Sequence, residues 1–247
     1  MTKLGIISDV HSDLPMLDAA LRRMRELGCD IIVCAGDLVD GDVFPDEVVA
    51  RLRDDKIPTI RGNHDRWALE HAGKLRSQAR RRIDLRRDGP PDFDAESGVY
   101  GSGAELGPET LAFLAKLPTS IQMEIEGVRM AVHHARPGVF GGDMVGIETR
   151  TTSPATMETL RGLASADVLL VGHTHERFAV RVPGGLVANP GALWDGSADY
   201  AKLDSLYVPA GPSYGTFGVL ELPSTRFTVY RADDGQVVLE DGPEGRS

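Results

Sequence analysis

The sequence predicts an α/β fold in which two sheets pack face to face and helices lie outside them. Two observations predict it. Over residues 1–61, short apolar runs alternate with helical patterns, as in parallel βαβ units. From residue 177 onward the chain consists mostly of short apolar runs separated by turn residues, which is typical of β-hairpins. No Pro-, Gly- or Ser-rich linker divides the 247 residues, so we expect a single domain over residues 1–247.

The opening βαβαβ unit contains three apolar strands, predicted at residues 3–8, 30–35 and 57–61. The helix after the first strand begins behind Asp13, whose side chain can cap it, and ends at Gly28. A shorter helix is predicted from Pro45 to Asp54, because its apolar residues recur at helical spacing. This order of elements predicts a parallel sheet in the N-terminal part of the chain.

The pattern changes after residue 65, where we expect a cap insertion over about residues 66–107. Its first part is helical and holds seven basic residues between positions 74 and 87, and its second part is a Gly- and Pro-rich loop. A charge run of this kind is usually a solvated helix face. The alternative is a cap that attracts an anionic substrate.

The remaining elements follow the same helix and strand periodicities. Helices are predicted from Pro108 to Leu117 and over residues 154–165. Strands are predicted at residues 119–126, 128–134, 167–172, 177–182, 185–188, 216–222, 226–231 and 236–240. Asp234 and Gly235 form a hairpin-type turn before the last of these strands.

Composition and charge exclude several classes of protein. The sequence has neither a signal peptide nor an apolar run near the ~20 residues that span a bilayer, so we expect a cytoplasmic protein without membrane contact. The net charge of −10 disfavours nucleic acid as an extended partner. Cys29 and Cys34 are expected to be reduced core residues. The sequence does not reveal the oligomeric state.

Metal-capable side chains gather at the ends of five apolar runs. Six of the seven histidines lie there, beside Asp, Asn and Gly. The residues are Asp9, His11, Asp37, Asp40, Asn63, His64, Asp65, His133, His134, His173 and His175. The carboxyl ends of the strands of an open α/β sheet lie along one edge, so these groups can meet. A single histidine is usually structural, but that explanation accounts poorly for six at strand ends.

His, Asp and Asn together form the ligand set of a hydrolytic metal centre. In such a centre, two divalent cations ~3.5–4 Å apart can share a bridging carboxylate and activate a bridging hydroxide. None of the motifs contains a cysteine, which disfavours a thiolate zinc site. We therefore expect two divalent metal ions, with Mn²⁺ favoured and Fe, Zn²⁺, Co²⁺ or Ni²⁺ as alternatives.

The ordered motifs resemble those of the calcineurin-like metallophosphoesterases, in particular a bacterial branch labelled phosphoesterase or diadenosine-tetraphosphatase-like. The chain contains D-x-H at 9–11, G-D-x-x-D at 36–40, G-N-H-D at 62–65, a strand-end His and G-H-x-H at 172–175. Asn189, Pro190 and Gly191 resemble a further element. Each motif is weak alone, but the ordered set is specific. The resemblance implies a four-layer α/β/β/α sandwich of two mixed sheets with helices outside, and a dinuclear site at the strand ends.

The resemblance also implies a role for each ligand. One metal would be held by Asp9, His11 and His175. Asp37 would bridge the two metals. The second metal would be held by Asn63, His173 and one histidine of the pair His133 and His134. We favour His134, because strand alternation points His133 to the opposite face.

His64 is not expected to be a ligand. In the family that this chain resembles, the corresponding histidine acts at the leaving-group oxygen as general acid or charge stabiliser, and Asn63 and His64 would contact the substrate. Asp40 is the carboxylate that we expect to position His64. Gly41 stands where similar phosphoprotein phosphatases have an Arg that grips phosphate, which disfavours that branch.

The predicted function is metal-dependent hydrolysis of phosphate esters by a dinuclear-metal-activated hydroxide, with a small phosphodiester or nucleotide as substrate. The alternatives are a phosphomonoesterase and a non-catalytic metal-binding scaffold, and the intact His64 disfavours the scaffold. Specificity is expected in residues 66–107, 138–153 and 192–215. The last range contains aromatic residues that either stack on a base or pack the loop onto the body, namely Trp194, Tyr200, Tyr207 and Tyr214.

Overall fold

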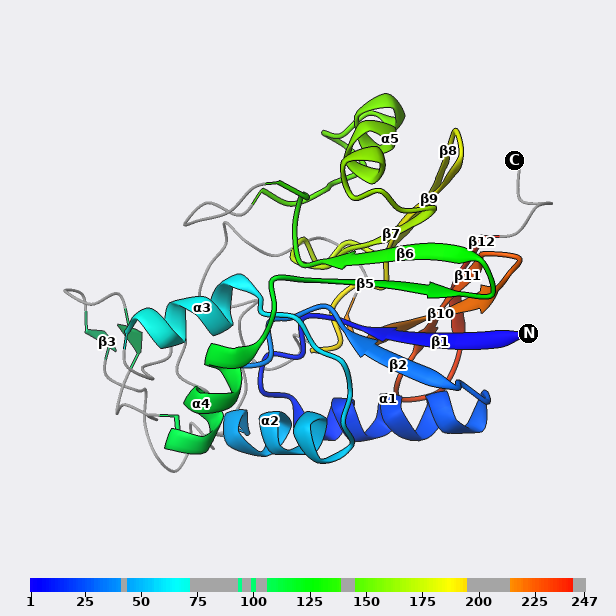
Figure 1. Cartoon of the computed structure of the whole chain (residues 1–247). Helices are drawn as coiled ribbons and strands as arrows, with labels where there is room; N and C mark the ends of the chain where they lie inside the picture. Colours follow the sequence, from blue (N-terminus) through cyan, green and yellow to red (C-terminus); the bar gives the residue numbers. More distant parts are fainter. Residues whose placement is uncertain are drawn as a thin grey trace.

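A computed structural model describes residues 1–40, 44–71, 93–94, 99–100, 106–138, 145–194 and 214–241 of the chain. Two five-stranded sheets pack face to face, and helices cover their outer faces (Figure 1). Helices α1 and α2 lie under one sheet, and α5 lies over the other (Figure 1). The predicted four-layer α/β/β/α sandwich of two mixed sheets is therefore confirmed.

The first sheet has the strand order β12-β11-β10-β1-β2. Its strands are β1 (Thr2–Ile7), β2 (Ile31–Cys34), β10 (Thr216–Leu222), β11 (Arg226–Arg231) and β12 (Val237–Asp241). Strand β1 runs parallel to β2 and antiparallel to β10, so the N-terminal βαβ unit and the C-terminal hairpins share one sheet. This mixed sheet therefore joins the two strand patterns predicted from the sequence.

The second sheet has the order β5-β6-β7-β9-β8. Its strands are β5 (Ser120–Ile125), β6 (Val128–His133), β7 (Val168–Leu170), β8 (Phe178–Val182) and β9 (Gly185–Asn189). The central strands β6, β7 and β9 are parallel, whereas β5 and β8 pair antiparallel at the edges.

The helices are α1 (Leu14–Glu26), α2 (Pro45–Asp54), α3 (Asn63–Glu70), α4 (Pro108–Lys116) and α5 (Pro154–Leu163). All but α3 begin and end close to the predicted positions. Helix α3 begins at Asn63, before the helical stretch predicted after residue 65, and residues 72–87 of that stretch lie outside the described residues. The Asp13 carboxylate accepts a hydrogen bond from the Met16 amide at 3.0 Å, which is the predicted cap of α1. Proline in the first turn starts α1, α2, α4 and α5, because its missing amide is not needed there.

Three apolar cores hold the layers together. Leu4 and Ile6 of β1 lie in the core between the two sheets, whereas Ile7 packs outward against the helices. Ala131 of β6 faces the third core, which Met157 of α5 covers. Successive strand residues point to opposite faces, so sheets covered on both sides need nearly continuous apolar strands. This is why strands such as β2 and β7 appear in the sequence as unbroken apolar runs.

Residues 57–61 differ from the prediction of a third strand. Their pairing to β2 is a single parallel bridge between Thr59 and Cys34. Pro58 has no amide hydrogen to donate, and β2 ends at Cys34, so the ladder does not extend. The Ile60 amide donates to the Cys34 carbonyl at 3.1 Å, and the Cys34 amide donates to the Pro58 carbonyl at 2.9 Å. These two hydrogen bonds still fix residues 57–61 beside the sheet.

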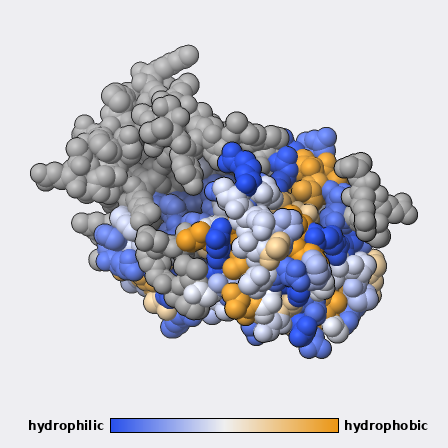
Figure 2. Space-filling view, turned by 90° about the horizontal axis from the view of Figure 1, so that it is seen from above, coloured by the Kyte–Doolittle hydropathy of each residue, from blue (hydrophilic) through white to orange (hydrophobic). Residues whose placement is uncertain are grey.

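Only part of the predicted cap insertion is described. The strands β3 (Phe93–Asp94) and β4 (Val99–Tyr100) form a small antiparallel pair inside the stretch predicted as a loop. The basic segment at residues 74–87 lies outside the described residues. On the face seen from above, hydrophilic and hydrophobic residues are interspersed over the described surface (Figure 2). Within the described ranges, no helix is long and apolar enough to span a membrane.

Candidate metal centre

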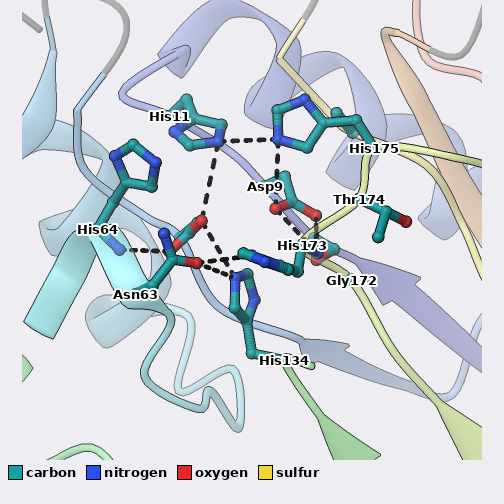
Figure 3. A network of polar contacts seen from close by, with 12 residues as sticks. Asp9, His11, Asn63, His64, His134, Gly172, His173, Thr174 and His175 are labelled. Atoms are coloured by element: carbon teal, nitrogen blue, oxygen red, sulfur yellow. Dashed lines mark hydrogen bonds and ion pairs between the residues drawn. The ribbon is translucent and has the colours of Figure 1, made fainter. Parts of the chain in front are cut away.

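The loops that follow β1, β2, β6 and β7 and the first turn of α3 bring the predicted site residues together (Figure 3). Backbone hydrogen bonds tie these loops to one another. The Asp9 amide donates to the Gly36 carbonyl at 2.9 Å, and the Gly172 amide donates to the His134 carbonyl at 3.1 Å. The side chains that meet are Asp9, His11, Asp37, Asp40, Asn63, His64, His134, His173 and His175.

Six of these nine residues have a left-handed backbone. They are Asp9, His11, Asp37, Asp40, His173 and His175, with φ between 47° and 72°. L-residues rarely adopt this conformation, which costs on the order of 1–3 kcal/mol each and persists only when the surroundings enforce it. The tight loops that result turn each side chain back toward the common point instead of continuing the strand.

The first group of side chains consists of Asp9, His11 and His175. The Nε2 atoms of His11 and His175 face each other at 3.2 Å, and His175 Nε2 lies 3.5 Å from Asp9 Oδ1. Burial alone would raise the pKa of Asp9, but the neighbouring His175 lowers it to about 2, so Asp9 is ionised. Burial lowers the pKa of His11 to about 4, so His11 is neutral at pH 7.

The second group consists of Asp37, His134 and His173, with Asn63 between the two imidazoles. Asn63 Oδ1 lies 2.9 Å from His134 Nε2 and 2.8 Å from His173 Nδ1. His134 Nε2 also lies 3.1 Å from Asp37 Oδ2. Burial would raise the pKa of Asp37, but His134 and His64 hold it well below its usual range.

Asp37 lies between the two groups. Its Oδ2 atom faces His134 of the second group at 3.1 Å and His11 of the first group at 4.0 Å. The His64 amide donates to Asp37 Oδ1 at 2.8 Å, which fixes the orientation of the carboxylate (Figure 3). A carboxylate in this position can reach both groups at once.

The donor pattern of the two groups fits a cation. His11 Nδ1 donates to the Asp40 carbonyl at 2.7 Å and His134 Nδ1 donates to the Ala35 carbonyl at 2.7 Å, so Nε2 of each ring points inward. His11 Nε2 meets His175 Nε2 at 3.2 Å, and His134 Nε2 meets the oxygens of Asp37 and Asn63, which accept hydrogen bonds. Such a convergence requires a positive charge at its centre.

The pKa of His134 reflects this requirement. Burial alone would lower it, but the adjacent Asp37 carboxylate raises it to about 10, so a proton occupies the lone pair that faces the oxygens. A divalent cation supplies the same positive charge, and its binding requires the imidazole to be neutral. The buried residues present therefore fit a metal site.

His64 lies beside these groups, close enough to His11 and Asp37 to form a third possible ligand group with them, and it is oriented by Asp40. His64 Nδ1 is 2.6 Å from Asp40 Oδ2, and the Asp40 side chain is almost fully buried. The imidazole of His64 is about a quarter exposed, and its ring centroid lies 4.9 Å from that of His11. The bond from Nδ1 to Asp40 holds the His64 ring in a fixed orientation beside the two groups.

Asp65 joins two of the motif loops. Its buried carboxylate accepts hydrogen bonds from the amides of Asp37, Leu38, Val39 and Gly62, at 2.8 to 3.3 Å. Burial and the Asp37 charge raise the pKa of Asp65 to about 6. The close approach leaves no room at Gly62, where a Cβ would lie 2.1 Å from Asp37 Oδ1. Asp65 thus braces the loop after β2 against the start of α3.

Sequence reasoning missed Ser8 and gave no role to Asn189. The Ser8 hydroxyl donates to Asp9 Oδ2 at 2.6 Å. The side-chain amide of Asn189 donates to the Gly172 carbonyl at 3.0 Å, which positions the loop of His173 and His175. A serine before a strand-end aspartate carries no distinguishing signal. The Asn189-Pro190-Gly191 motif was a signal for Asn189, but its partner could not be predicted.

Comparison with known proteins agrees with this geometry. Residues 2–204 match the family described as the calcineurin-like phosphoesterase superfamily domain. An uncharacterised protein, MJ0912 of Methanocaldococcus jannaschii, is 25% identical over 202 residues, which are 77% of this chain and 70% of that protein.

Two solved structures share the fold. One is a metallophosphoesterase from Sphaerobacter thermophilus, with a TM-score of 0.59 and 21% identity, covering 93% of this chain and 87% of that one. The other is the hypothetical protein PH1004 from Pyrococcus horikoshii, with a TM-score of 0.60 and 17% identity, covering 98% of this chain and 88% of that one. With a family match over more than three quarters of its length, the chain belongs to the calcineurin-like phosphoesterase superfamily, a family of metal-dependent hydrolases.

Proposed function

We propose that this protein hydrolyses a small phosphodiester or nucleotide-type ester at a site that holds two divalent cations. One observation carries the proposal, namely the 2.6 Å pair of His64 and Asp40 beside the converging groups. A scaffold that only binds metal needs ligands, whereas a hydrolase must also stabilise the leaving oxygen. The oriented His64 supplies that second requirement.

The proposed ligands follow the two groups of side chains. Asp9, His11 and His175 hold one cation, Asn63, His134 and His173 hold the other, and Asp37 bridges them. Support comes from the position of Asp37 between the groups and from the inward-pointing Nε2 atoms of His11 and His134. Bound there, two cations such as Mn²⁺ would lower the pKa of a water molecule and offset charge on the phosphoryl oxygens.

In this proposal the chain itself positions the leaving group. An imidazolium at His64 can donate through Nε2 to the leaving oxygen while Nδ1 remains bonded to Asp40. The Asp40 carboxylate is buried, so it stabilises the imidazolium more strongly than it would in water. Because the His64 amide also donates to Asp37, the acid and the proposed bridging carboxylate keep a fixed geometry.

The charges at the site support a small ester over a phosphoprotein. Four ion pairs of the described site residues join Asp to His, namely His11–Asp37, His64–Asp40, His134–Asp37 and His175–Asp9. Gly41, which stands where similar phosphoprotein phosphatases carry an Arg, lies outside the described residues. We expect phosphate binding to depend on the cations and on the neutral and acidic groups around them.

Hydrolysis of bis-p-nitrophenyl phosphate in the presence of Mn²⁺ tests the proposal. We expect turnover that a chelator abolishes and that added Mn²⁺ restores, because the converging ligands require a cation. The monoester p-nitrophenyl phosphate, measured in parallel, distinguishes a diesterase from a phosphomonoesterase. Stoichiometric metal binding with no hydrolysis of either ester would instead favour a scaffold.

The choice between the two adjacent histidines gives a second prediction. His134 is buried and faces Asp37 and Asn63, whereas His133 pairs with Ser120 in the β5–β6 ladder and has a pKa lowered by burial. We expect His134→Ala to weaken Mn²⁺ binding by more than the ~10–100-fold that loss of an outer-shell partner causes. His133→Ala should retain metal. Metal analysis after dialysis measures both, and the reverse result would move the ligand to His133.

A further inference from the structure

Two aromatic side chains extend the site beyond the proposed metal ligands. The ring of Trp194 lies 5.6 Å from that of His11 and 6.2 Å from that of His175, measured between centroids. Tyr214 lies 6.0 Å from His175 and 5.9 Å from Trp194. The two rings therefore form one aromatic wall against the Asp9–His11–His175 group.

The backbone holds this wall in register with the site. The Trp194 amide donates to the Asp9 carbonyl at 3.0 Å, and the preceding Leu193, fully buried, donates to the Ser8 carbonyl at 2.9 Å. The Gly215 amide donates to the Trp194 carbonyl at 3.3 Å, which places Tyr214 beside Trp194. The strand-end loop that carries Asp9 thus positions both aromatic residues.

The location of the wall distinguishes it from packing in the core. Phe217 and Tyr230 are an aromatic pair used for packing, since their rings stack at 5.6 Å, Phe217 is fully buried, and Tyr230 packs against the same apolar core. Trp194 and Tyr214 are only partly buried, and they lie at the site. Aromatic rings that remain partly exposed beside a polar site provide surface for a planar group.

The position relative to His64 indicates which part of a substrate the wall would meet. His64 contacts His11 ring to ring at 4.9 Å, and His11 contacts Trp194 at 5.6 Å. A phosphoryl group held by the site would thus have its leaving oxygen near His64 and one of its organic substituents near Trp194.

We propose that Trp194 and Tyr214 form a subsite for the planar aromatic group of the ester, in biological substrates a nucleobase. This inference rests on the proposed phosphoesterase function and names its substrate class, an ester of a nucleoside. Stacking on aromatic side chains tolerates any base, because every base has a π-face. We therefore expect selection for a nucleoside without strong selection for one base.

A pair of diesters with the same leaving group tests the subsite. Thymidine 5′-(p-nitrophenyl phosphate) carries a base, and methyl p-nitrophenyl phosphate does not. We expect Trp194→Ala to lower the ratio of kcat/KM for the thymidine ester to kcat/KM for the methyl ester by about 5- to 100-fold. A role limited to packing against His11 and His175 would change both substrates alike and leave the ratio constant. Trp194→Phe should restore most of the ratio.

A binding measurement gives a readout besides activity. The chain has two tryptophans, Trp67 and Trp194, so Trp67→Phe leaves Trp194 as the only tryptophan reporter. Trp67 lies on α3 and stacks on His71, with 4.0 Å between the ring centroids. In the Trp194→Phe variant Trp67 is the only tryptophan, and its fluorescence serves as the matched control. In the Mn²⁺-loaded Trp67→Phe protein, uridine 5′-monophosphate should quench the fluorescence, and ribose 5-phosphate should not.

Two results would overturn the subsite. One is equal quenching of Trp194 by uridine 5′-monophosphate and ribose 5-phosphate, and the other is an unchanged kcat/KM ratio in Trp194→Ala. Either result counts against the subsite when the wild-type protein hydrolyses bis-p-nitrophenyl phosphate. If the wild-type protein does not hydrolyse this ester, the proposed phosphoesterase function has failed. The two failures are therefore distinguishable.

Discussion

Asp37→Asn is expected to lower metal content and phosphoesterase activity together. Asp37 is 1% exposed, and its carboxylate faces both groups of proposed ligands through His134 at 3.1 Å and His11 at 4.0 Å. An amide cannot ionise, and its N–H₂ would point a donor at a place where a cation needs a lone pair. Loss of an outer-shell partner costs about 10–100-fold in metal affinity, so we expect a bridging ligand to cost more.

Metal analysis and bis-p-nitrophenyl phosphate turnover on the same preparation measure this effect. Asp13→Asn is the matched control, because Asp13 is also a buried strand-end aspartate but caps α1, a role that Asn retains. It should keep wild-type metal content. Full metal occupancy with wild-type turnover in Asp37→Asn would contradict the bridging role.

His64→Gln should reduce kcat by about 10²- to 10⁴-fold while the metals remain bound. The glutamine keeps a polar side chain of similar reach but cannot carry the proton that the leaving oxygen requires. Because His64 is proposed to act on the leaving group and not as a ligand, metal content should not change. The loss should be largest for esters with poor leaving groups, and p-nitrophenyl esters should suffer less.

His71→Gln provides the control for this substitution. His71 lies at the end of the same helix, α3, where it is exposed and stacks on Trp67. It does not take part in the hydrogen bond between His64 and Asp40. It should leave kcat unchanged. Release of metal from the His64 variant would show that His64 is a ligand and that the leaving group needs another acid.

Most of the fold could be predicted from local patterns. Apolar runs gave the strands, and proline and Asp13 gave the starts of the helices, because these signals act over a few residues. The segment at residues 57–61 was predicted wrongly as a strand. Its apolar residues are buried, but Pro58 and the short β2 limit its pairing to one bridge. Periodicity reports burial, whereas a strand also needs a partner of sufficient length.

The sequence by itself determined which residue types stand at the strand ends and the family to which the chain belongs. The tertiary structure decided how they meet. His11 and His175 are 164 positions apart, yet loops from the two sheets bring their Nε2 atoms to 3.2 Å. The left-handed backbone of both residues, the Asp65 brace and the place of Trp194 beside His11 depend on contacts between distant segments. No local pattern encodes such contacts, because strain of this kind is stable only in the completed fold.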